Sequence, residues 1–137
     1  MPYITDRVVH DADSHAMELP DWFSEFGTRQ VKKAFDERFK GGKDLDGLPK
    51  LHSSNEYRSQ NEAEIMTRKN YQALGAFDRN DRSEAVNHLG VATQLVFPTS
   101  PNVWLEQLEH GQDIELLYEV ADATNRAQAC LLYTSDA

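Results

Sequence analysis

The chain has 137 residues, of which 39% are hydrophobic, and its 14 basic and 23 acidic residues give a formal net charge of −9. An acidic chain without a basic patch is not suited to binding nucleic acid or an anionic membrane surface, so we expect neither as a partner. The sequence contains no signal peptide and no apolar run near the ~18 residues of a membrane span. It has a single cysteine. Together these features indicate a cytoplasmic protein without disulfides.

The first predicted element is a strand in residues 8–15, with the sequence VVHDADSH. Because side chains alternate along a strand, residues 9, 11, 13 and 15 are expected to share one face. Asp13 and His15 would then point the same way at the carboxyl end of the strand. A carboxylate beside an imidazole is half of a divalent metal site. The alternatives are that Asp13 turns the chain after the strand and that His15 is an ordinary hydrogen-bonded or exposed histidine.

A long charged segment, called the excursion below, is predicted to follow the first strand, from residue 16 to about residue 80. Residues 29–40 have apolar side chains at helical spacing and are followed by Gly41-Gly42, which predicts a helix that ends there. Residues 43–57 are expected to form an exposed loop, and residues 62–71 a further helix. Glu18, near the start of the excursion, is interpreted as an exposed loop charge, with a metal ligand or a contact to substrate as the alternatives.

The sequence patterns that predict helices and strands are clearer after residue 80. The sequence from Asp81 to Glu84 resembles a capping box, and Gly90 stands where a helix is expected to end. Residues 94–97 form a nearly continuous apolar run, which is typical of a buried strand in a parallel sheet. A second helix is predicted over residues 113–129. Thr99, just after this second strand, either lines a pocket or belongs to a turn between two prolines.

The last eight residues, CLLYTSDA at positions 130–137, do not continue the pattern. They resemble one reading frame of a transposase mosaic-end adapter used in DNA sequencing libraries. A segment of that origin is excluded from fold reasoning. We therefore expect native protein in residues 1–129 and a non-native tail that makes few buried contacts. The alternative is a native terminal strand.

Three segments resemble one enzyme family. Residues 10–20, HDADSHAMELP, are similar to the first-strand signature of the amidohydrolase-related metal-dependent hydrolases, whose motif is commonly D-x-H-x-H. The present motif, D-x-D-x-H, resembles the branch of nonoxidative decarboxylases that includes aminocarboxymuconate semialdehyde decarboxylase. Residues 85–99 look like the first helix and second strand of that family. Residues 124–126, TNR, stand where the family usually has Tyr-Asn-Arg.

This resemblance implies an α/β fold, in which residues 1–129 are the N-terminal part of a truncated (β/α)₈ barrel with a long charged insertion after its first strand. It makes Asp13 and His15 ligands of a divalent ion, Zn²⁺ or Mn²⁺. Asp11 would be a neighbouring carboxylate that orients a ligand. Glu18 and Thr99 are the candidates for contact with substrate. The catalytic acid or base would come from later strands and is not identified in this chain.

The implied function is metal-dependent hydrolysis or nonoxidative decarboxylation of a small organic carboxylic substrate. The resemblance is compatible with a homo-oligomer for the full-length enzyme. A barrel needs ~250 residues, so the present chain is expected to be inactive by itself. The alternative is a noncatalytic acidic α/β binding module.

Overall fold

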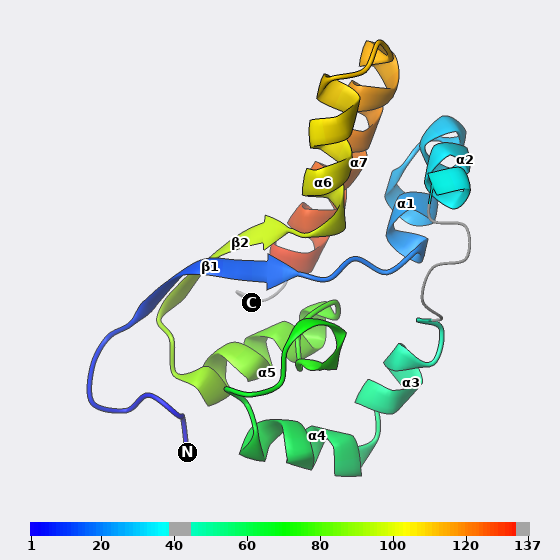
Figure 1. Cartoon of the computed structure of the whole chain (residues 1–137). Coiled ribbons are helices and arrows are strands. Elements are labelled where there is room, and N and C mark those ends of the chain that lie inside the picture. Colours follow the sequence, from blue (N-terminus) through cyan, green and yellow to red (C-terminus); the bar gives the residue numbers. More distant parts are fainter. Residues whose placement is uncertain (39–44, 134–137) are drawn as a thin grey trace.

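The computed structural model describes residues 1–38 and 45–133, and Figure 1 shows the arrangement of its elements. Its two strands, β1 (His10–Ala16) and β2 (Thr93–Pro98), pair in parallel. The sequence therefore predicted both strands and their relative direction correctly. The α/β class is confirmed. A sheet of two strands among the described residues does not by itself make a barrel, which remains a proposal.

The main core lies beyond the carboxyl end of β1, between α1 (Asp21–Phe26), α2 (Arg29–Arg38) and the long helix α7 (Ile114–Tyr133). Phe23 stacks on Phe35 with ring centroids 4.6 Å apart, and Phe23 and Trp104 pack edge to face with ring centroids 5.5 Å apart. These rings occupy the centre of the packing. The predicted helical spacing in α2 is confirmed for Val31 and Phe35, which are buried, whereas Phe39, Gly41 and Gly42 lie outside the described residues.

The excursion is more helical than its sequence suggested. Part of the segment expected to be a loop forms α3 (Leu48–His52) and the start of α4 (Asn55–Ala63). The hydroxyl of Ser54 accepts a hydrogen bond from the N–H of Tyr57 and begins α4, which is a typical N-cap. The helix predicted over residues 62–71 is wrong, because α4 ends at Ala63 and only the short turn η1 (Asn70–Gln72) follows.

Helix α5 (Arg79–Leu89) starts two residues before the expected capping box. Its N-cap is Asp78, whose carboxylate accepts hydrogen bonds from the N–H groups of Asn80 and Asp81 at 2.7 and 3.2 Å. The expected end at Gly90 is confirmed. Gly90 has a φ of 77°, a left-handed conformation that glycine adopts without strain.

Two antiparallel helices follow β2, as Figure 1 shows. The first, α6 (Ser100–Glu109), was not predicted, and α7 (Ile114–Tyr133) extends past the expected end at residue 129. Leu131 is only 4% exposed and belongs to the main core. The expectation that residues 130–137 make few buried contacts is therefore wrong at Leu131, because the helix continues and places Leu131 four residues after the buried Ala127. Residues 134–137 lie outside the described residues.

Among the described residues, no helix combines the length and the apolar character that a membrane span requires.

Candidate functional site

The carboxyl end of β1 contains an irregularity that changes the predicted faces. Asp11 pairs with Gln94 and Ser14 with Val96, so β1 advances three residues while β2 advances two. Such a bulge breaks the alternation of side chains. As a result Asp11 and Ser14 lie opposite residues on one face of β2, whereas His15, opposite Phe97, lies on the other. The expectation that Asp11 shares a face with His15 is therefore wrong.

Asp13 and His15 are nevertheless brought together. The Oδ1 atom of Asp13 is 3.3 Å from the Nε2 atom of His15, and the two side chains are 86% and 45% exposed. Asp11 lies beside this pair but bonds elsewhere. Its carboxylate accepts hydrogen bonds from the N–H of Asp13 and the side-chain amide of Gln94, both at 3.1 Å. Asp11 therefore supports the backbone at Asp13 and not the ring of His15.

Thr99 determines which nitrogen of His15 carries the proton. The Thr99 hydroxyl lies 2.7 Å from the carbonyl oxygen of Ala16, its nearest acceptor, and 3.2 Å from Nδ1 of His15. A hydroxyl has one hydrogen. Because that hydrogen is donated to Ala16, the Thr99 oxygen accepts from an Nδ1–H of His15. A neutral His15 then has its lone pair on Nε2, the nitrogen that lies 3.3 Å from Oδ1 of Asp13.

The 3.3 Å between Nε2 of His15 and Oδ1 of Asp13 can be compared with the spacing of two ligands on one metal ion. Two ligands about 2.1 Å from one ion lie about 3.4 Å apart at the tetrahedral angle and about 3.0 Å apart at a right angle. The observed separation lies within that interval, so the two donor atoms fit one divalent ion.

Glu18 is not the exposed loop charge that the sequence suggested. It is 4% exposed, and its carboxylate accepts hydrogen bonds from the N–H groups of Thr99 and Ser100 at 2.7 and 3.0 Å. Burial raises the pKa of Glu18 above its ordinary value, and these hydrogen bonds oppose the rise. Both carboxylate oxygens are thus used to fix the turn between β2 and α6. Glu18 positions Thr99, which in turn orients His15.

Arg82 is a residue that the sequence analysis missed. It comes from α5, is 6% exposed, and donates hydrogen bonds to the carbonyls of His15 and Gly75 at 3.1 and 3.2 Å and to the hydroxyl of Ser14 at 2.6 Å. Burial lowers the pKa of Arg82, and the charge of Asp11 partly opposes this. Its position in a helix rich in charged residues gave no signal of burial.

A pocket of about 360 Å³ lies next to Asp13 and His15. Residues of β1 form one wall, and the connection around Lys69 and Asn70 together with α5 form the others. The volume lies in the range of small-molecule sites. The pocket joins the candidate metal ligands to Arg82 in one concave surface.

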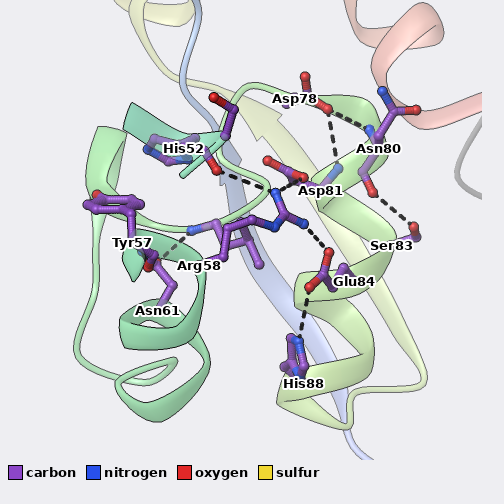
Figure 2. Close-up of polar contacts among 12 residues, drawn as sticks. His52, Tyr57, Arg58, Asn61, Asp78, Asn80, Asp81, Ser83, Glu84 and His88 are labelled. Carbon is purple, nitrogen blue, oxygen red and sulfur yellow. Dashed lines mark hydrogen bonds and ion pairs between the residues drawn. The ribbon is translucent and has the colours of Figure 1, made fainter. Parts of the chain in front are cut away.

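A charged cluster attaches the excursion to α5 (Figure 2). Arg58 of α4 donates to the carboxylate of Asp81 at 2.6 Å, to the carboxylate of Glu84 and to the carbonyl of His52 at 3.4 Å. On the next turn of α5, the Nε2 atom of His88 lies 3.4 Å from Glu84. These contacts hold α4 against α5 and are structural.

The described residues contain no group of three or more His, Cys, Asp and Glu side chains placed to hold a metal ion. Comparisons with protein family models, with curated proteins and with solved structures found no match. The family resemblance therefore rests on the motifs quoted above, and the functional argument rests on the geometry of the site.

Proposed function

We propose that Asp13 and His15 bind a divalent metal ion, Zn²⁺ or Mn²⁺, and that the chain is the opening part of a metal-dependent (β/α)₈ enzyme. The observation that carries the proposal is the 3.3 Å separation of Asp13 Oδ1 and His15 Nε2, with the Nδ1 proton of His15 held by Thr99. Orienting a ligand histidine through its second nitrogen is a common feature of metal sites.

The position of the pair agrees with this proposal. Asp13 and His15 lie near the carboxyl end of β1, which pairs in parallel with β2. In barrels of this kind the chemistry takes place at the carboxyl ends of the strands. Glu18 and Thr99 come from the same end, and in this proposal they hold His15 in place. The substrate lies in the pocket beside the pair, and neither Glu18 nor Thr99 is among the residues that line that pocket.

The reaction proposed is hydrolysis or nonoxidative decarboxylation of a small organic carboxylic substrate. The ion, when bound, polarises a substrate oxygen or a water molecule as a Lewis acid in either reaction. The protein's contribution at this point is to present one carboxylate oxygen and one imidazole nitrogen in fixed positions. Two ligands leave most of the coordination to water, so we expect weak metal binding by the chain as given.

Paramagnetic broadening by Mn²⁺ in NMR spectra tests the proposal, because it detects weak binding. We expect selective broadening of the ring signals of His15 at pH 7.5, with displacement of Mn²⁺ by Zn²⁺. Asp13→Asn and His15→Gln should each weaken binding at least about tenfold. The matched control is His10→Gln, since His10 lies on the same strand and its Nδ1 also contacts a threonine hydroxyl, at 2.7 Å from Thr93. That variant should bind Mn²⁺ as the wild type does.

Broadening centred on His10, or binding that survives Asp13→Asn, would contradict the proposal. A lack of binding in the wild type would favour the noncatalytic binding module. A separate test of the barrel is to read the source DNA beyond codon 129. Further strands with histidine and aspartate at their carboxyl ends are expected there, and a stop codon in the native frame directly after that point would refute the barrel.

A further inference from the structure

A second pocket, of about 400 Å³, is lined by residues of α1, of α3, of the start of α5 and of the end of α7. It shares no lining residue with the pocket beside β1. Three aromatic rings form part of its wall. Trp22 and Phe77 are 9% and 7% exposed, and Phe26 is half-buried. The volume is that of a small-molecule site, and the aromatic wall favours a ligand with an apolar body.

Three carboxylates line the same pocket: Asp21 and Glu25 of α1, and Asp78, the N-cap of α5. The side chains of Asp21 and Glu25 make no ion pair and no hydrogen bond within the described part of the chain. Because they are four residues apart, they are neighbours on one face of α1 and repel each other. The cap of α5 uses only the Oδ1 atom of Asp78, so Oδ2 has no hydrogen bond among the described residues.

The charge of the pocket selects the sign of its ligand. Among the described residues that line it, Arg79 is the only basic one, and its Nη1 atom lies 3.8 Å from the sulfur of Cys130, on the α7 side. Three carboxylates against one guanidinium group give the lining a formal charge of −2. Carboxylates attract a cation by charge, and aromatic rings attract it through their faces. An organic cation with an apolar body therefore matches both parts of the lining.

We propose that this pocket binds a small aromatic amine in its ammonium form, with the ammonium group at Asp21 and Glu25 and the apolar body against the aromatic wall. The side chains that the proposal uses all lie within residues 1–129. It rests on neither the metal site nor the barrel, and its ligand has the opposite charge to the proposed carboxylic substrate. Because Asp21 and Glu25 are exposed, water screens their attraction, and we expect a dissociation constant of about 1 mM.

The test uses 2-phenylethylamine as the probe, near neutral pH and in the presence of EDTA. One control is 2-phenylethanol, which has a similar shape without the charge, and the other is methylammonium, which has the charge without the apolar body. Binding is followed by the indole N–H signals in NMR spectra. The chain has two tryptophans, and of these Trp22 lines the pocket. We expect the amine to shift the signal of Trp22 more than that of Trp104, and each control to bind about fivefold more weakly.

Two double variants locate the binding. Asp21→Asn with Glu25→Gln removes the ammonium site and should weaken binding of 2-phenylethylamine about fivefold. The matched control is Glu106→Gln with Glu109→Gln, which changes the net charge equally. These two glutamates are exposed residues of α6 and lie outside the pocket. The control should bind the amine as the wild type does. All four replaced side chains are exposed, and an unchanged signal of Trp104 will verify that each variant is folded.

The proposal would be overturned if the signal of Trp22 did not shift, if 2-phenylethanol bound as tightly as the amine, or if Asp21→Asn with Glu25→Gln bound as the wild type does. Equal losses of affinity in the two double variants would also overturn it, because the net charge of −9, and not this pocket, would then attract the amine. The test involves neither a metal ion nor a change at Asp13 or His15, so its failure and the failure of the proposed function give different results.

Discussion

Leu131→Ala should destabilise the protein substantially, although the sequence indicated that residues 130–137 contribute nothing to the fold. Leu131 is 4% exposed and packs in the core that contains Val120 and Ala127 of the same helix. Replacing a buried leucine with alanine costs about 2–5 kcal/mol, depending on the void that remains. Leu131 also lines a surface pocket with Trp22 and Phe77, so water or neighbouring side chains can fill part of the void. We therefore expect the free energy of unfolding to fall by about 2–3 kcal/mol, in the lower half of that range.

Urea unfolding monitored by tryptophan fluorescence measures this loss, because Trp22 and Trp104 both lie in the same core as Leu131. The matched control is Ile114→Ala, since Ile114 is on the same helix but is 63% exposed. The control should remain within about 0.5 kcal/mol of the wild type. Removing residues 130–137 should cost at least as much as Leu131→Ala. If Leu131→Ala is as stable as the control at an unchanged m-value, the burial of Leu131 is refuted.

Three further predictions concern other parts of the fold. Burial lowers the pKa of His52 below its ordinary 6.5, so the unfolded chain binds more protons and stability falls as the pH drops from 6.5 through the lowered pKa. Urea midpoints at pH 7.5 and 5.0 should show a smaller loss on acidification in His52→Gln than in the wild type. Thr99→Val removes the acceptor for the Nδ1 proton of His15 and should weaken Mn²⁺ binding about tenfold, whereas Thr99→Ser should retain it. Gly75→Ala should lower the melting temperature and cost at least about 1 kcal/mol, because Gly75 has a φ of 73° and an added Cβ would lie 2.7 Å from the backbone of α5. Gly47→Ala is its control, since an added Cβ there meets nothing within 4 Å, and equal melting temperatures for the two variants would contradict the prediction.

The chain alone determined the features that depend on local periodicity. Alternation in residues 8–15 and the apolar run in residues 94–97 predicted two strands and their parallel pairing, and both are present. The glycine at position 90 predicted the end of α5 because only a residue tolerant of positive φ ends a helix in this way. Asp13 and His15 were expected to lie together, and they do, because they are only two residues apart on one strand.

Tertiary structure decided the features that depend on contacts between distant segments. The bulge in β1 is visible only in its register with β2, and it moved Asp11 to the other face from His15. Glu18 is buried because backbone N–H groups 81 and 82 residues away need an acceptor, which no local pattern reveals. Arg82 is buried for a similar reason, since its partners lie on β1 and in the turn before α5. Periodicity reports which face of an element is apolar, but the polar groups that meet across elements, and hence the detailed site, follow only from how the elements pack.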